Sequence, residues 1–272
     1  MTTAALAPRT ALFLPASNPR AIAKARGLGA DMVILDLEDA VKAEDKDAAR
    51  GAAVDAVAER FGRSLSAIRL NGIETQQHDA DVAAVAASLA DYAVLPKAED
   101  AAQVARLIET LGKPLLAMIE TPSGVLAAAD IAALPGVAGL IAGTNDLAAT
   151  LRLPPSSGRD AMTLALQTIV LAARAGDAWA LDGVFNKLDD AEGLEGESKA
   201  GRALGFDGKT LIHPNQIHIA TQAFGATAQE VAEAEALVAA ATGGAERYRD
   251  RMIETMHVDQ ARTLLARLDG AR

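Results

Sequence analysis

The chain has 272 residues, of which half are hydrophobic and only 3% aromatic, so Ala, Leu and Val must build most of its core. This length suits one large α/β domain or two small ones, and a barrel of about 250 residues is a natural fit. The formal net charge of -10 argues against nucleic acid as a partner, and the lack of cysteine excludes disulfides, thiolate chemistry and cysteine-based zinc sites.

Eight short apolar runs recur along the chain. They are nearly continuous rather than alternating, which is typical of parallel strands that are covered on both faces. The runs occupy residues 11–15, 32–37, 67–70, 92–96, 115–119, 137–142, 179–181 and 210–212.

Stretches rich in alanine and charged residues lie between these runs and have helical character. They span residues 20–28, 46–60, 79–89, 101–111, 124–134, 160–175, 193–204 and 215–224. Pro19, Pro122 and Pro214 stand where first helical turns would begin. Alternation of strand and helix predicts a parallel α/β fold, and eight such units predict a closed (β/α)8 TIM barrel.

The residues after the eighth unit lie outside this pattern. A helix is predicted over residues 228–241, a break follows at Thr242, Gly243 and Gly244, and a charged segment, 245–251, leads to an amphipathic helix over 258–268. We therefore expect a barrel over residues 1–226 and a C-terminal helical extension over residues 227–272. The extension would serve as a lid or as an arm that contacts a neighbouring subunit.

Polar residues follow each of the predicted strands. In a barrel the carboxyl ends of the strands share one face, and the active site is built there. Buried charges must be paired or hydrated, so a protein that only packs has no need to gather them at one face. The strand-end residues are Asp36, Glu38, Asp39, Arg69, Asn71, Lys97, Glu120, the run Gly143-Thr144-Asn145-Asp146, Asp182 and His213.

Several of these residues also have an ordinary structural interpretation. Asp39 fits a helix cap as well as a catalytic acid, and Lys97 fits a solvated ion pair with its acidic neighbours. His213 before Pro214 fits a helix start as well as a ligand contact, and Asp182 before Gly183 fits a turn.

The remaining assignments are clearer. Asn145-Asp146 also fits a turn, but Glu120, Asp146 and Arg69 together fit a site better than separate structural roles. The other histidines, His78, His218 and His257, are expected at the surface.

A membrane location is not expected. No apolar run approaches the roughly 20 residues that span a bilayer. Residues 1–8 lack the apolar core and cleavage site of a signal peptide. We therefore expect a cytoplasmic protein with no membrane partner.

An ordered set of motifs resembles the HpcH/HpaI aldolase and citrate lyase superfamily, and most closely its citrate lyase β-subunit-like branch, which includes malyl-CoA and citramalyl-CoA lyases. Each motif is weak by itself, but the set covers nearly the whole chain in the right order. The motifs are LFLPASNP (12–19), VILDLEDAV (33–41), KDAAR (46–50), IRLN (68–71), LPKAE (95–99), IETPSG (119–124), GTNDLA (143–148), GFDGKTLIHPNQI (205–217) and MIE (252–254).

The resemblance implies a TIM barrel that assembles as a trimer or hexamer and holds Mg²⁺, with Mn²⁺ as an alternative. The two metal ligands would be Glu120 and Asp146. Arg69 would face the developing enolate of a thioester as an oxyanion-binding group. Asp36 and Glu38 would orient metal-bound waters.

The same resemblance places a thioester of coenzyme A, or of an acyl carrier, along the barrel mouth beside a 2-oxo acid. Segments that match regions near this ligand supply the expected substrate-binding residues. They are Arg69, Gly143, Thr144, Asn145, Pro15, Ser17, His213 and Asn215.

One motif departs from the family pattern. The thioester lyases carry an aspartate in a C-terminal MID-type motif, on a lid that reaches into the neighbouring subunit's site and acts in acid–base catalysis. Here the motif reads Met252-Ile253-Glu254, and Met256 stands where a proline is usual. Glu254 has the same carboxylate on a longer stem, and we expect it to be the proton donor in cleavage and the base in condensation.

The leading functional hypothesis is a Mg²⁺-dependent lyase that cleaves a 3-hydroxyacyl thioester of citramalyl, malyl or citryl type to an acetyl thioester and a 2-oxo acid. Thioester hydrolysis at the same site is the first alternative. A second is a citrate lyase β-like subunit that works only in a complex with an acyl carrier protein. A class II aldolase for pyruvate is less consistent with the LDLED and IHPNQ motifs.

Overall fold

The computed structural model describes residues 6–270, which form two compact units. The first contains Ala7–Phe224 and is called the barrel unit below, and the second begins at Gly225 and is called the C-terminal unit. Each unit is described by itself.

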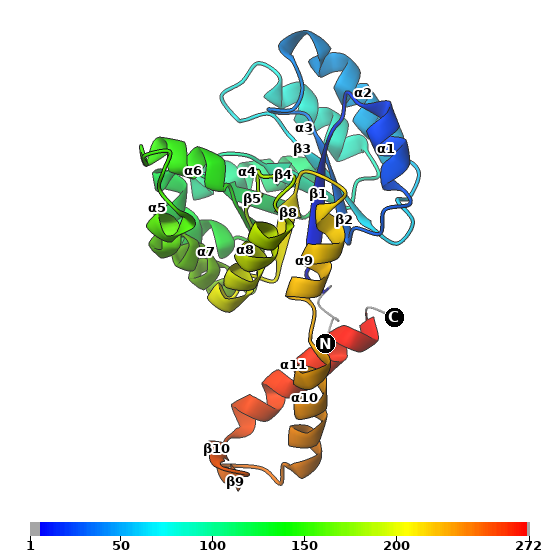
Figure 1. Ribbon diagram of the computed structural model, residues 1–272. Coiled ribbons are helices and arrows are strands. Elements are labelled where there is room, and N and C mark those ends of the chain that lie inside the picture. Colours follow the sequence, from blue (N-terminus) through cyan, green and yellow to red (C-terminus); the bar gives the residue numbers. More distant parts are fainter. Residues whose placement is uncertain (1–5, 271–272) are drawn as a thin grey trace. The chain divides into compact units, whose positions relative to one another are not determined.

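Eight parallel strands close into a barrel, and β1 pairs with both β2 and β8 (Figure 1). The predicted (β/α)8 fold is therefore confirmed. The strands are β1 (Thr10–Pro15), β2 (Met32–Asp36), β3 (Leu65–Arg69), β4 (Tyr92–Leu95), β5 (Leu115–Ile119), β6 (Val137–Ala142), β7 (Trp179–Asp182) and β8 (Gly208–Leu211).

Helices surround the barrel, and several begin at a capping side chain. Asn18, Asp100, Thr121 and Asp190 each accept a hydrogen bond from a backbone N–H in the first turn. The helices are α1 (Pro19–Ala25), α2 (Lys46–Val57), α3 (His78–Ala87), α4 (Ala101–Leu111), α5 (Pro122–Ala132), α6 (Thr144–Thr150), α7 (Thr163–Ala175), α8 (Ala191–Leu204) and α9 (Gln216–Phe224).

The short helix α6 was not expected, because residues 143–146 were interpreted as a loop or turn after the sixth strand. Two single 3₁₀ turns, η1 (Ala43–Asp45) and η2 (Arg159–Met162), also lie between the regular elements.

Side chains alternate between the inside and the outside of the barrel, as the two-residue period of a strand requires. The inside is filled by one buried cluster that includes Met32, Ile34, Leu116 and Ile141. The outward residues of the strands pack with the helices in a larger cluster. Residues that continue the inward positions past the strand ends therefore face the mouth of the barrel.

Two aromatic rings meet near the opposite end of the barrel. Tyr92 is the first residue of β4 and Trp179 is the first residue of β7, and their ring centroids are 5.3 Å apart. Both belong to the inner cluster or pack against it. They close the barrel at the amino ends of its strands, far from its mouth.

The C-terminal unit has a small core of its own, which includes Leu237, Tyr248 and Ile253. Helix α10 (Ala228–Ala240) starts at a capping box, and α11 (Thr255–Gly270) packs against it (Figure 1). Between them, β9 (Glu246–Tyr248) and β10 (Arg251–Ile253) form an antiparallel hairpin. The prediction of only a charged segment at 245–251 was therefore incomplete.

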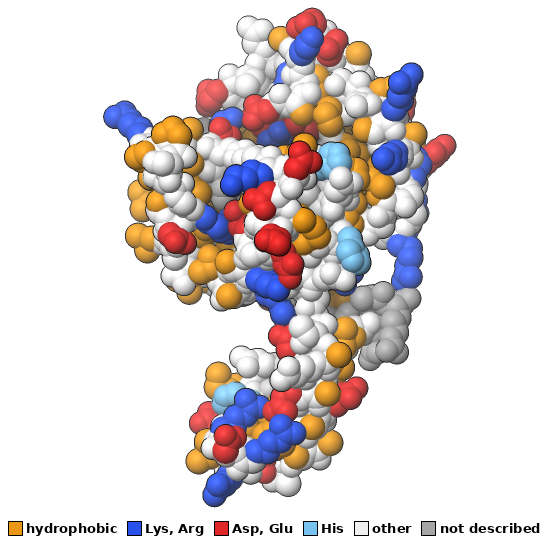
Figure 2. All heavy atoms as spheres, viewed as in Figure 1, with side chains coloured by type: hydrophobic (Ala, Val, Ile, Leu, Met, Phe, Trp, Pro, Cys, Tyr) orange, Lys and Arg blue, Asp and Glu red, His pale blue; other side chains and the backbone are white. Residues whose placement is uncertain are grey.

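On the barrel face shown in Figure 2, lysine and arginine side chains alternate with acidic ones and form no continuous basic strip among the residues drawn in colour. Within residues 6–270, no helix is long and apolar enough to cross a bilayer.

Candidate active site

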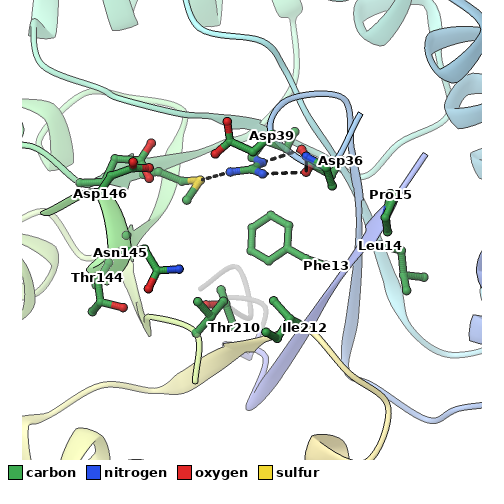
Figure 3. A pocket seen from close by; sticks show the side chains of 17 residues that line it. Phe13, Leu14, Pro15, Asp36, Asp39, Thr144, Asn145, Asp146, Thr210 and Ile212 are labelled. Atoms are coloured by element: carbon green, nitrogen blue, oxygen red, sulfur yellow. Dashed lines mark hydrogen bonds and ion pairs between the residues drawn. The ribbon is translucent and has the colours of Figure 1, made fainter. Parts of the chain in front are cut away.

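A pocket of about 420 Å³ opens at the carboxyl ends of the strands. Figure 3 shows Thr144, Asn145 and Asp146 on one side of it and Asp36 on the other, with the Phe13 ring between them. The predicted residues that line it are Pro15, Asp36, Asp39, Arg69, Glu120, Gly143, Thr144, Asn145 and Asp146. Their roles in binding or catalysis remain predictions, but the fold brings these side chains together.

Arg69 is held rigidly at the wall of this pocket. Its Nε and Nη2 donate to the two oxygens of Asp36 over 2.6 and 2.7 Å, and its Nη1 lies 2.8 Å from Glu38 Oε2. The guanidinium carbon also lies 5.0 Å from the centroid of the Phe13 ring. Burial disfavours the charged form, but the bonds and charges of Asp36 and Glu38 outweigh it and raise the pKa of Arg69.

Asp36 connects this arginine to the loop that follows β2. Besides Arg69, its carboxylate accepts the backbone N–H groups of Glu38 and Ala40 over 2.8 and 3.0 Å. Four donors therefore converge on two oxygens. Asp36 in this arrangement fixes the position of Arg69, a contact that the sequence did not reveal.

Lys46, from the KDAAR segment, fixes the same loop from the other side. Its ammonium donates to the carbonyl oxygens of Leu37 and Glu38 over 2.7 Å each and to Asn71 Oδ1 over 2.6 Å. The three hydrogens of the ammonium thus have three acceptors. The loop that carries the acids is tied directly to the end of β3.

Asn71 continues this network toward α3. Its backbone and side-chain N–H groups both donate to Asp81 Oδ2, and Asp81 also pairs with Arg50. His78 Nδ1 lies 2.9 Å from the Asn71 carbonyl oxygen, and the His78 side chain is buried. The expectation of a surface position for His78 was therefore wrong, because the residue opens α3 on its inner face.

Glu120 directly follows β5 and is almost fully buried. Its Oε1 accepts the Lys97 backbone N–H over 2.8 Å. Gly143 faces it, and a β-carbon at that position would overlap the Glu120 side chain. Burial raises the pKa of Glu120 to about 7, and the nearby charges of Glu38 and Asp146 act in the same direction.

Asp146 reaches the pocket from the first turn of α6, whose N-cap is Gly143. The neighbouring Asn145 exchanges two hydrogen bonds with Asn186, which lies in the loop after β7. The segment that was predicted as a strand-end turn is thus the start of a helix that presents consecutive polar side chains to the pocket.

The donors near Glu120 fit a hard divalent cation. Carboxylate oxygens are the preferred protein ligands of Mg²⁺, which usually keeps several waters and takes only one or two carboxylates. A cation there would offset the burial and the neighbouring negative charges that raise the pKa of Glu120. In addition, Glu38 Oε2 is buried without a hydrogen bond despite its closeness to Arg69.

The protein ligands alone would not fill the shell of such an ion. Across residues 6–270, no three His, Asp or Glu side chains gather closely enough to hold a metal by themselves. A cation at Glu120 and Asp146 would therefore take its other ligands from water and substrate.

Lys97 bridges two of the acids. Its backbone N–H reaches Glu120 and its Nζ donates to Glu38 Oε1 over 2.8 Å. The interpretation of Lys97 as a solvated pair with the adjacent acids was wrong about the partner, which lies on the loop after β2. Neighbouring acidic groups, with Glu38 first, overcome the effect of burial and raise the pKa of Lys97.

Asp182 does not point into the pocket, although it ends β7 as predicted. It occupies an outward position, where it is fully buried against Lys209 Nζ at 3.0 Å and against Arg159. Glu197 of α8 also accepts from Lys209 over 2.7 Å. This network was not expected from the sequence, in which its only signal was Lys209 directly before a predicted buried strand.

The other predicted ligand-binding residues lie outside the pocket lining. Ser17 and Asn215 are exposed, and His213 accepts the Asn215 backbone N–H at Nδ1 over 3.3 Å. This contact agrees with the helix-start interpretation of His213. Ser17 precedes the residue that caps α1, and nothing in its contacts bears on substrate binding.

Glu254 belongs to the C-terminal unit, where it is exposed at the start of α11. Its backbone N–H donates to His257 Nδ1 over 3.0 Å, and the flanking Met252 and Met256 are exposed as well. The side chain of Glu254 is thus accessible to solvent.

Comparison with known proteins agrees with the resemblance. The HpcH/HpaI aldolase/citrate lyase family matches residues 9–214. A (3S)-malyl-CoA thioesterase of Cereibacter sphaeroides is 40% identical over 96% of this chain and 95% of its own length. A citrate lyase subunit beta-like protein of Mycobacterium tuberculosis is 36% identical over the same shares.

A solved structure extends this similarity to the fold. Mycobacterium tuberculosis CitE, in complex with magnesium, acetoacetate and coenzyme A, matches with a TM-score of 0.84 at 36% identity, over 97% of this chain and 98% of that one. With its ordered motifs, its barrel and these relatives, the chain belongs to the HpcH/HpaI aldolase/citrate lyase family.

Proposed function

We propose that this chain is a Mg²⁺-dependent enzyme that cleaves a 3-hydroxyacyl thioester to an acetyl thioester and a 2-oxo acid. The observation that carries the proposal is the convergence of Glu120, Asp146 and a rigidly held Arg69 on one pocket. The complex of the Mycobacterium tuberculosis relative with magnesium, acetoacetate and coenzyme A supports the same set of ligands.

Glu120 and Asp146 would hold the ion. When bound, Mg²⁺ supplies a Lewis acid that stabilises negative charge on the oxygens of the oxo acid. Thr144 and Asn145 line the pocket beside Asp146 and would contact the same end of the substrate. Phe13, Met118 and Ile212 give the pocket an apolar part, which would contact the side chain of the oxo acid.

Arg69 would stabilise the charge that develops on the thioester oxygen as the carbon–carbon bond breaks. A donor that is already fixed needs no reorganisation during the reaction, which makes such a group effective. Asp36 and Glu38 provide this rigidity, because between them they contact all three guanidinium nitrogens. Their role here is to position Arg69.

Glu254 would transfer a proton to or from the acetyl carbon. In this proposal it comes from a neighbouring copy of the chain, so that the active form is a homo-oligomer, either a trimer or a hexamer. The exposed carboxylate is available for such a role.

Thioester hydrolysis is the second candidate. It is favoured by the relatives in Cereibacter sphaeroides, which are (3S)-malyl-CoA thioesterases and align over nearly the full length of the chain. Hydrolysis would use the same bound thioester, with water attacking its carbonyl carbon and coenzyme A leaving as the thiol.

Product analysis tests these proposals. The purified protein is incubated with Mg²⁺ and a panel of 3-hydroxyacyl-CoA thioesters, and the products are identified by mass. Acetyl-CoA with a 2-oxo acid indicates the lyase, whereas free coenzyme A with an intact hydroxy acid indicates the hydrolase. Turnover of a carrier-linked substrate alone would show that the chain acts as a subunit with an acyl carrier protein.

Site variants connect either activity to the pocket. Glu120→Ala and Asp146→Ala should each abolish activity and Mg²⁺ binding. Glu109→Ala, which changes an exposed acid on α4, is the matched control and should leave both unchanged. Full activity of the Glu120→Ala variant would refute the metal assignment.

A further inference from the structure

Lys97 has a backbone conformation that normally favours glycine. It follows β4 with a φ of 50°, in the left-handed region that side chains with a β-carbon rarely adopt. Three other non-glycine residues among those described have a positive φ. Arg152 and Asp177 follow helices and Arg249 lies in a hairpin turn, whereas Lys97 adopts this conformation at the mouth of the barrel.

The surrounding structure holds the Lys97 backbone in place. Its N–H donates to Glu120 Oε1, and the N–H of the next residue, Ala98, donates to the Met118 carbonyl over 3.1 Å. Helix α5 approaches so closely that a β-carbon on Gly124 would lie 2.6 Å from the Ala98 carbonyl oxygen. Glycine at position 97 would keep all of these contacts with less strain, so the backbone does not account for lysine.

The side chain supplies what glycine lacks. The Lys97 ammonium donates to Glu38 Oε1 over 2.8 Å, and Arg69 Nη1 lies 2.8 Å from the other oxygen of that carboxylate. Glu38 thus lies between two cations. Glu120 receives only a neutral N–H from Lys97, so the ammonium pairs with Glu38 and not with Glu120.

We propose that Lys97 is a positioning residue that holds Glu38 beside Arg69. A divalent cation at the mouth of the barrel is then bound by Glu120 and Asp146 and not by Glu38. This inference rests on the proposed Mg²⁺ site. Without the ammonium, Glu38 would be free to turn toward the cation and leave Arg69 less well held. The site would then be more negative and less well ordered.

An ordinary exposed ion pair predicts a different result. Such pairs contribute little, and their loss changes neither metal binding nor turnover. The side chain of Lys97 is 44% exposed but that of Glu38 is only 9% exposed, so one partner is desolvated. A purely structural role would instead weaken Mg²⁺ binding when the lysine is removed.

The test measures Mg²⁺ binding to the metal-free full-length protein by isothermal titration calorimetry. Lys97→Gly keeps the N–H to Glu120 and eases the backbone but removes the ammonium. We expect it to bind Mg²⁺ about threefold to tenfold more tightly than the wild type, because Glu38 is no longer held by the ammonium and its carboxylate adds negative charge near the ion. Its kcat should fall by at least about tenfold, since Arg69 is less well positioned. Lys97→Arg keeps a positive charge at this position, so its Mg²⁺ affinity and its kcat should both stay near those of the wild type.

Two further variants make the result specific to the ammonium. Lys97→Ala also lacks the charge but keeps the backbone strain, so its affinity for Mg²⁺ should match that of Lys97→Gly even if it is less stable. Arg152→Gly relieves the same type of backbone conformation and removes a positive charge at an exposed position, and it should change neither value.

A Glu38→Gln background tests whether Glu38 is the group through which Lys97 acts. In a Glu38→Gln protein, Lys97→Gly should no longer change the affinity for Mg²⁺, because the acid it would release is absent. An unchanged or weaker affinity of Lys97→Gly in the wild-type background, or an equal gain in the Glu38→Gln background, would overturn the inference. Failure of the metal-site proposal itself would look different. In that case Glu120→Ala would bind Mg²⁺ as tightly as the wild type does.

Discussion

At the scale of single residues, Glu120 has a buried carboxyl whose proton is held more tightly in the folded chain than in the unfolded one. Its pKa is about 7 rather than 4.5. Such a group contributes stability below its unfolded pKa and loses it as the pH rises through the folded pKa. The difference corresponds to about 3 kcal/mol of unfolding free energy.

A neutral replacement should therefore stabilise the metal-free protein at high pH. With a chelator present, Glu120→Gln should exceed the wild type at pH 8 by up to about 3 kcal/mol and approach it near pH 4.5. Urea unfolding followed by circular dichroism at the two pH values measures the difference. A difference that does not depend on pH would contradict the assignment of this pKa shift to Glu120.

The sequence predicted the positions of Glu120, Asp146 and Arg69 but not what holds them. Their placement follows from strand order, since the carboxyl ends of parallel strands share one face. The contacts of Lys46 and Lys97 join residues that are 8 to 59 positions apart in the chain, and no local pattern encodes them. The direction of the Asp182 side chain was likewise not predictable from its place at a strand end, because the register of the strand decides that it faces outward.

At the scale of elements, the start of α6 packs closely against the end of β5, because Gly143 has no side chain between them. Its φ of -95° is ordinary, so the need for glycine comes from the closeness of Glu120 and not from the backbone. The interface between these two elements thus sets the distance between the two proposed metal ligands.

Gly143→Ala should displace the Glu120 side chain. We expect a loss of at least about tenfold in Mg²⁺ affinity and a destabilisation of about 1–3 kcal/mol from overpacking. Gly51→Ala on α2, where a β-carbon meets nothing within 4 Å, is the control and should be neutral or slightly stabilising. Calorimetric titration and thermal unfolding provide the two readings, and equal Mg²⁺ binding by both variants would refute the argument.

The buried network between β7, β8 and α8 should be important for stability. Lys209→Met would leave the carboxylates of Asp182 and Glu197 without their shared ammonium, at a cost of about 3–5 kcal/mol. Lys199→Met, which breaks an exposed pair on α8, should cost less than about 1 kcal/mol. Denaturant unfolding compares the two variants, and similar costs would show that burial of Lys209 adds little.

The eight barrel strands were predictable because apolar runs mark them, but β3 and β8 each begin two residues before the predicted run, at Leu65 and Gly208. Helix α6 was missed since its seven residues are too few to show a helical period. The hairpin β9–β10 was missed because its strands have three residues each and carry charged side chains. Packing within the C-terminal unit, where Tyr248 and Ile253 are buried, stabilises strands that lack a local signal.

At the scale of the whole molecule, the proposal divides one active site between two copies of the chain. Each chain carries both halves, with Arg69 in the barrel unit and Glu254 in the C-terminal unit. The trimer or hexamer, the domain boundary at residue 226 and the cytoplasmic location stay predictions.

Subunit mixing tests the shared site directly. Arg69→Ala and Glu254→Ala should each be inactive alone, the first because charge on the thioester oxygen is not stabilised and the second because the proton donor is lost. When the two variants are unfolded together and reassembled, mixed oligomers should regain a substantial fraction of wild-type turnover. Failure of mixed oligomers to regain activity would place both residues in a site formed by one chain.

The contact of Tyr92 with Trp179 gives this chain a selective optical signal. Trp179 is the chain's one tryptophan, and it lies at the amino end of β7, away from the mouth. Tryptophan emission will therefore report loss of barrel packing and stay nearly constant when a ligand enters the mouth. The helical signal in the far ultraviolet, by contrast, comes from the helices of both units.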